Sequence, residues 1–81
     1  MKTTEDFNNK WKDYLEEGFY GMAINNLEVI EYLDKEFEKE IKVNPEFNYA
    51  QIKLKFGYPR IYANSKNTRE WEKQITKLLR N

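Results

Sequence analysis

The feature that most constrains the fold is the alternation of apolar and polar residues across residues 51–56. Successive side chains on a β-strand point to opposite faces, so this period of two predicts a half-buried strand. We expect Ile52, Leu54 and Phe56 to face a core. The intervening residues, two of which are lysines, then face solvent.

A second strand is expected directly after the first. Gly57 and Pro59 interrupt the alternation, which resumes over residues 60–63, and this pattern is typical of a β-hairpin. The solvent face of the hairpin then gathers cationic and aromatic side chains. Its candidate binding residues are Lys53, Lys55, Arg60 and Tyr62.

Three helices are expected around the hairpin. The first begins at a Thr3 or Thr4 cap and stops at Gly18. The second is capped by Asn25 or Asn26 and runs to about Lys39 or Ile41, before the interruption at residues 43–45. The third follows residue 67, where Asn67 and Glu70 have capping-box spacing. The predicted fold is a single α+β domain spanning residues 1–81, in the order α-α-β-β-α, with the hairpin packed on the helices. Its predicted core is Phe7, Trp11, Leu15, Ile30, Leu33, Phe37, Ile52, Leu54, Ile61, Trp71, Ile75 and Leu78.

The composition narrows the function classes. The chain of 81 residues has no cysteine and no histidine, which removes thiol catalysis, imidazole bases and the commonest zinc ligands. Ser65 is the single serine, and no histidine exists to activate it. We therefore expect no enzyme, no cofactor and no metal site, and we interpret the acidic second helix as a solvated face. The two tryptophans are expected to be packing anchors.

Charge is divided unevenly along the chain. Residues 1–47 carry six basic and twelve acidic side chains, whereas residues 48–81 carry eight basic and two acidic ones. The basic part is expected to neutralise the acidic part within the fold or to meet an acidic partner. A net charge of zero disfavours long nucleic acid. With no long apolar run and no signal-peptide pattern, we expect a cytoplasmic protein with no membrane partner.

Two further features have alternative interpretations. The apolar loop at residues 18–22 is bracketed by glycines and could close over the core or line a pocket, with Tyr20 available to stack on a ligand. The hairpin edge has little protection beyond Pro59, so a homo-oligomer paired through that edge is a second expectation.

The hairpin also carries a resemblance to a family. Residues 51–62 resemble the Q-[VI]-K-x-K-F-G-x-x-R-[FI]-Y signature of small uncharacterised proteins of bacteriophages and prophages. The resemblance covers about residues 18–65, including the Gly-aromatic segment and the helix before the hairpin. It implies a phage or mobile-element setting, in which small proteins often bind components or nucleotide signals of antiphage defence.

Two functional hypotheses follow. In the first, Lys53, Lys55 and Arg60 hold the phosphate of a small anionic ligand such as a nucleotide signal, while Tyr20 or Tyr62 stacks on its base. In the second, the same face or the acidic helix docks on a host defence protein and blocks it. The sequence does not separate them.

Overall fold

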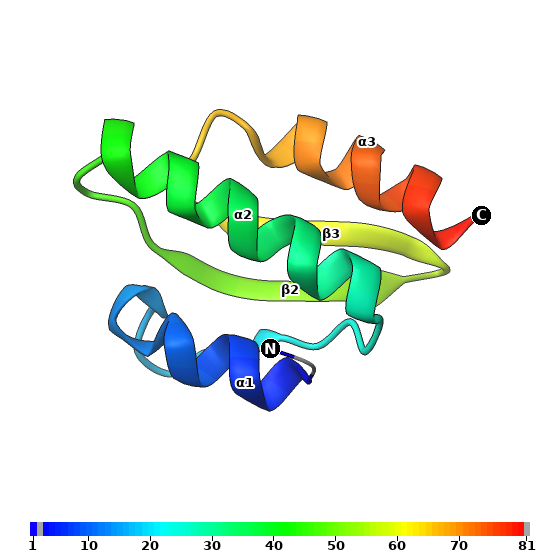
Figure 1. The fold of residues 1–81 in the computed structure, drawn as a ribbon, viewed down its shortest axis with the longest axis horizontal. Helices are drawn as coiled ribbons and strands as arrows, with labels where there is room; N and C mark the ends of the chain where they lie inside the picture. The colour runs from blue at the N-terminus through cyan, green and yellow to red at the C-terminus, as the bar shows by residue number, and fades with distance from the viewer. Residues whose placement is uncertain (2, 81) are drawn as a thin grey trace.

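The computed structural model describes residues 1 and 3–80 as one α+β domain, which confirms the predicted class and the order α-α-β-β-α. Figure 1 shows α2 lying across the two long strands, with α1 and α3 at opposite borders of the sheet. The elements are α1 (Thr4–Lys10), a short 3-10 helix η1 (Lys12–Tyr14), β1 (Gly21–Met22), α2 (Leu27–Val43), β2 (Tyr49–Lys55), β3 (Tyr58–Ala63) and α3 (Thr68–Leu79).

The sheet has three strands in the order β1-β2-β3. The hairpin of β2 and β3 is antiparallel, as predicted, whereas β1 pairs parallel to β2. Strand β1 was not predicted, because a strand of two residues shows no alternation. This strand depends on a distant side chain: Asn8 on α1 accepts the Met22 N–H at 2.8 Å and donates to the Met22 carbonyl at 3.1 Å.

The first helix is shorter than predicted. It ends at Lys10 rather than near Gly18, and residues 12–14 tighten into η1. Beyond η1 the backbone becomes extended at Leu15, which forms an isolated parallel bridge with Tyr49 of β2. The Glu16 N–H then donates to the Tyr49 carbonyl at 2.7 Å. Pairing with the sheet therefore replaces the last helical turn that the apolar periodicity indicated.

Helix α2 follows the prediction closely. Asn26 caps it by accepting the Val29 N–H at 3.1 Å, and it ends at Val43, two residues beyond the later of the two predicted ends. Helix α3 also begins after Asn67, as predicted, but the proposed capping box with Glu70 is wrong. The Asn67 side chain makes no cap hydrogen bond and instead donates to Glu40 on α2 at 2.9 Å.

The core lies between α2 and the sheet, and aromatic rings fill its centre. The Phe37 ring packs edge-on against four rings at centroid distances of 4.8 to 5.3 Å, those of Phe7, Trp11, Phe47 and Tyr49. Eleven of the twelve predicted core residues are buried or pack against the buried cluster, and Leu15 and Leu78 are the partly buried ones among them.

Leu54 and Phe56 contradict the predicted core. Leu54 is 46% exposed, although it pairs with the buried Pro59 and so belongs to the inward set of the strand. Figure 1 shows the hairpin turn reaching past the start of α2, so α2 does not cover this end of the inner face. Phe56 is 91% exposed because it lies in the turn itself, where the strand alternation has ended.

Candidate functional site

The candidate site is the outer face of the hairpin, and we call it the hairpin face. Cross-strand pairing places Lys53 opposite Arg60, while Tyr62 lies opposite Gln51 and Tyr58 opposite Lys55. The alternate residues of the same strands, such as Ile52 and Ile61, are buried. The hairpin face comprises Gln51, Lys53, Lys55, Tyr58, Arg60 and Tyr62.

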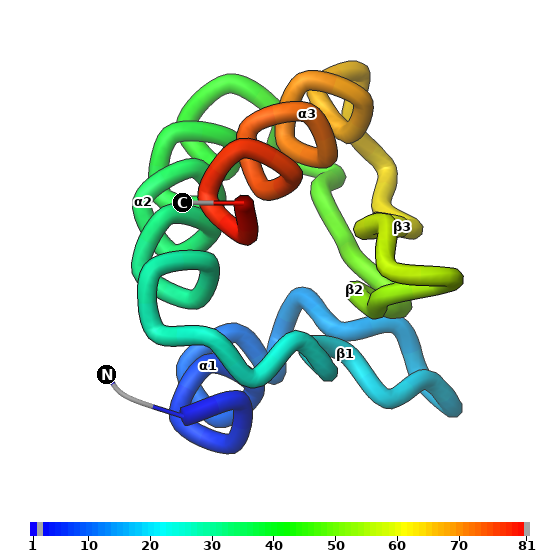
Figure 2. Tube along the Cα trace, turned by 90° about the vertical axis from the view of Figure 1, so that its right-hand side faces the viewer, coloured from blue at the N-terminus to red at the C-terminus, as the bar shows by residue number. Residues whose placement is uncertain are grey.

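The hairpin face is open. Figure 2 shows α2 on one side of β2 and β3, and none of the described helices lies on the opposite side of these strands. Four of the five sequence-predicted site residues therefore come together on one uncovered surface: Lys53, Lys55, Arg60 and Tyr62.

Two cations oppose each other directly at the centre of this face. Lys53 and Arg60 are Cα partners, an arrangement that is unfavourable for like charges on one sheet face. Within residues 1 and 3–80, ion pairs involve only Lys10 and Lys39, so neither central cation has an acidic partner. The Arg60 Nη1 donates only to the carbonyl of neighbouring Pro59 at 3.1 Å, and the Lys53 Nζ lies 5.8 Å from the centre of the Tyr62 ring. The pair is available to an anion.

Tyr20, the fifth predicted site residue, lies apart from this cluster. It precedes β1, whose Gly21 is level with Gln51, so Tyr20 is level with about residue 50 in the neighbouring strand. Lys53 is three residues further along β2, which corresponds to about 10 Å of strand. The Tyr20 side chain is 80% exposed. Tyr20 therefore does not belong to the same cluster as Lys53 and Arg60.

The loop at residues 18–22 has a divided role. Met22 is buried in the core, whereas Phe19 and Tyr20 are exposed. The end of the loop therefore closes over the core, as one of the two interpretations expected, and its start lies on the surface.

Helix α3 adds cations that the sequence analysis did not single out. Arg69, Lys73, Lys77 and Arg80 recur at a spacing of three or four residues and are all exposed, so they form one stripe on the helix. The Arg80 guanidinium lies 5.9 Å from the centre of the Tyr58 ring. This contact connects the end of α3 to the hairpin face. The helical periodicity of the four cations was the signal that could have revealed the stripe.

The free edge of β3 has fewer available donors than expected. The Ile61 N–H donates to the Glu72 carboxylate of α3 at 2.8 Å, and Pro59, two residues earlier on the same edge, has no N–H. On the other side of the hairpin, β1 pairs with β2. A homo-oligomer paired through the hairpin edge stays a prediction, and α3 would compete with it for the Ile61 donor.

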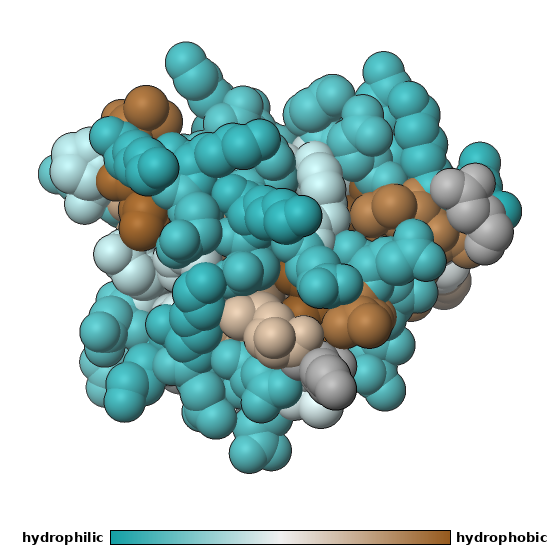
Figure 3. Space-filling view, viewed as in Figure 1, coloured by the Kyte–Doolittle hydropathy of each residue, from teal (hydrophilic) through white to brown (hydrophobic). Residues whose placement is uncertain are grey.

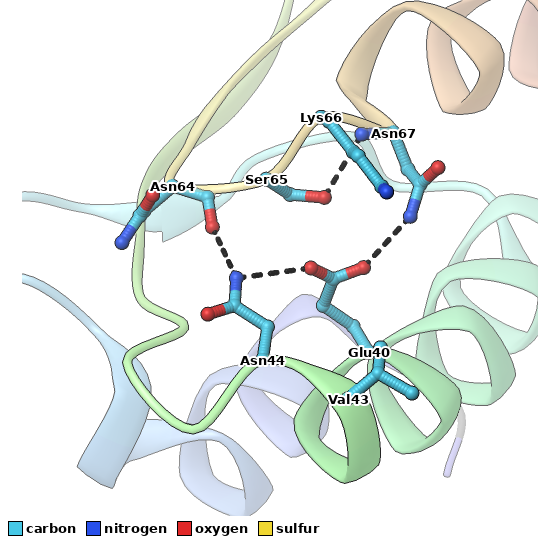
Figure 4. Close-up of a pocket in the computed structure, with 7 residues that line it drawn as sticks. All are labelled: Glu40, Val43, Asn44, Asn64, Ser65, Lys66 and Asn67. Carbon is cyan, nitrogen blue, oxygen red and sulfur yellow. Dashed lines mark hydrogen bonds between the residues drawn. The ribbon is translucent and has the colours of Figure 1, made fainter.

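A separate pocket of about 300 Å³ lies between the end of α2 and the segment joining β3 to α3 (Figure 4). The buried Glu40 carboxylate at its base accepts hydrogen bonds from the side-chain amides of Asn44 at 3.0 Å and Asn67 at 2.9 Å. Asn44 donates in addition to the Asn64 carbonyl at 2.8 Å. These groups satisfy one another, so the pocket is best explained as a polar clamp that joins α2 to the start of α3.

The acidic side chains of α2 are also partly structural. The indole N–H of Trp11 donates to Asp34 at 2.9 Å, and that of Trp71 donates to Glu36 at 3.1 Å. Both tryptophans are buried. The described residues contain no group of three or more acidic side chains placed to hold a metal ion.

Comparisons with known proteins yield no match among family models, curated proteins or solved structures. The resemblance to phage proteins in residues 51–62 therefore stays a prediction. None of the described helices is both long enough and apolar enough to cross a membrane.

Proposed function

We propose that the protein is a non-enzymatic binding module that captures an anionic group on the hairpin face. The observation that carries this proposal is the directly opposed pair of Lys53 and Arg60, which has no acidic partner in the described residues. Two like charges held together repel each other, and an anion placed between them would relieve that repulsion.

The chemistry of the site fits a phosphate-bearing ligand such as a nucleotide signal. Arginine presents a planar fork that binds two phosphate oxygens, and lysine adds a compact charge beside it. Tyr62 lies on the same face, 5.8 Å from the Lys53 Nζ, where its ring is available to stack on a base. The setting we propose, a phage or mobile-element protein acting against host defence in the cytoplasm, is supported by the resemblance in residues 51–62.

A second candidate is the acidic surface of a host protein. The hairpin face is an uncovered strand surface rather than a concave pocket, whereas small-molecule sites are usually concave. An open face that carries tyrosine and arginine has the composition of a protein interface.

The test of the nucleotide candidate is isothermal titration of the full chain with a panel of linear and cyclic nucleotides. We expect at least one to bind, and binding should weaken as salt is added because the contacting charges are exposed. The double variant Lys53→Glu, Arg60→Glu should weaken that binding at least about tenfold, because it replaces both anion-binding charges with repulsive ones.

The matched control is Lys12→Glu, Lys35→Glu, which changes the net charge equally at exposed positions away from the hairpin face. Both double variants should melt close to the wild type, since exposed charges contribute little to stability. Full nucleotide affinity in the Lys53→Glu, Arg60→Glu variant would overturn the proposed site. Failure of every nucleotide to bind the wild type would reject this candidate.

A further inference from the structure

The hairpin turn presents apolar side chains that the proposed anion site does not explain. Phe56 is 91% exposed, and its neighbours flank it on opposite faces of the hairpin: Leu54 on the inner face is 46% exposed and Tyr58 on the hairpin face is 49% exposed. We call these three residues the tip patch. Figure 3 shows hydrophobic surface at the right-hand end of the molecule, where Figure 1 places the hairpin turn and the end of α3.

Phe56 occupies a backbone conformation that favours other residues. Its φ is +53° and that of Gly57 is +80°, so both central residues of this two-residue hairpin loop are left-handed. Such turns prefer Asn-Gly, because asparagine tolerates the left-handed region far better than a bulky residue. Burial of the Phe56 ring does not offset this backbone strain, because the ring is exposed to solvent. Strain at an exposed aromatic residue points to a role outside the fold.

Cations lie beside the tip patch on the side of Tyr58. Lys53 and Lys55 precede the turn on β2, Arg60 follows it on β3, and Arg80 lies over the Tyr58 ring. No ion pair within the described residues involves any of these four. A partner that covers the patch must therefore offer apolar contacts together with negative charge.

We infer that the tip patch docks a protein segment whose apolar side chains are flanked by aspartate or glutamate, with Phe56 as its anchor. The inference extends the second candidate of the proposed function and rests on that function for the role of the cations. It favours a protein over a lipid surface because tyrosine and arginine are fixed by cross-strand pairing beside the patch, and these residue types dominate the binding energy of protein interfaces.

The test is a selection of random twelve-residue peptides displayed on yeast against the full chain. We expect the enriched peptides to combine aromatic or aliphatic residues with neighbouring acidic ones. The Phe56→Asn variant should bind those peptides at least about 30-fold more weakly, the size of effect typical for loss of a central anchor. It should melt no lower than the wild type, because asparagine suits the turn better.

The control is Val43→Asn, which removes a side chain that is 79% exposed at the far end of α2 and should leave peptide affinity unchanged. Three results would overturn the inference: enrichment of peptides without acidic residues, equal binding by Phe56→Asn, or binding to vesicles of phosphatidylglycerol with no peptide enriched. The two proposals fail separately. Loss of peptide binding in the Lys53→Glu, Arg60→Glu variant but not in Phe56→Asn would retain the hairpin face as the site and reject the tip patch.

Discussion

Gly21 combines a left-handed backbone with no room for a side chain. Its φ is +74°, and a Cβ atom built there would collide with the Asn8 Oδ1. That oxygen already accepts the Met22 N–H at 2.8 Å and the Tyr49 hydroxyl at 3.1 Å. Glycine therefore allows α1, β1 and β2 to meet through one asparagine side chain.

We predict that Gly21→Ala destabilises the fold by about 2–4 kcal/mol, the sum of left-handed strain and damage to the Asn8 hydrogen bonds. Gly18→Ala is the matched control, since Gly18 has φ +87° but open space around its missing Cβ. It should cost only the backbone strain, about 1–2 kcal/mol. Urea denaturation measures both, and equal losses would show that contact with Asn8 contributes nothing.

At the scale of elements, the same strand contains a position that the core covers and one that it does not. Ile52 is fully buried, whereas Leu54 points to the same side beyond the start of α2. We predict that Ile52→Ala costs about 3 kcal/mol and Leu54→Ala about 1 kcal/mol or less, because a half-exposed leucine loses less apolar burial and leaves no cavity. Thermal melting of the two variants measures the difference. A larger loss at Leu54 would mean that the turn packs more closely than the structure shows.

The sequence was sufficient to predict those helices and strands that are long enough to show a repeating apolar pattern. The alternation in residues 51–56 predicted both the hairpin and its cationic face, and Asn25 or Asn26 marked the start of α2. It was insufficient where a contact distant along the chain decides the outcome. Asn8 fixes β1, and Tyr49 draws Leu15 out of the first helix. The apolar periodicity of a short segment does not predict either of these two contacts.

The candidate site also has parts that the sequence predicts and parts that depend on tertiary packing. Residues on paired strands follow from register, so Lys53 and Arg60 could be placed together from the alternation alone. The contribution of α3 depends on where the helix ends against the hairpin, and the contact of Arg80 with Tyr58 is a consequence of tertiary packing. The exposure of Phe56 was likewise hidden, because strand alternation does not show where the turn begins.

At the scale of the whole molecule, the two tyrosines that connect α2 and β2 to the core resist ionisation. Burial raises the pKa of Tyr49 far above its ordinary value of 10. Burial also raises the pKa of Tyr32 to about 12, with smaller contributions from the negative charges of Glu36 and Glu70. In the unfolded chain both hydroxyls would titrate near about pH 10.

We therefore predict that alkaline conditions unfold the protein. Above about pH 10 the unfolded chain releases tyrosine protons that the folded chain retains, so the free energy of unfolding falls as pH rises, and the contribution of Tyr32 is lost progressively up to its folded pKa of about 12. Each retained proton steepens the fall by at most about 1.4 kcal/mol per pH unit.

Tyr49→Phe should lower stability at neutral pH, because it removes the hydrogen bond to Asn8, yet it should reduce the alkaline slope. Comparing the variant with the wild type in urea at each pH cancels the titration of the lysines. Phenolate absorbance of the folded protein supplies the independent check: if all six tyrosines ionise together near about pH 10, Tyr32 and Tyr49 are not protected by the fold.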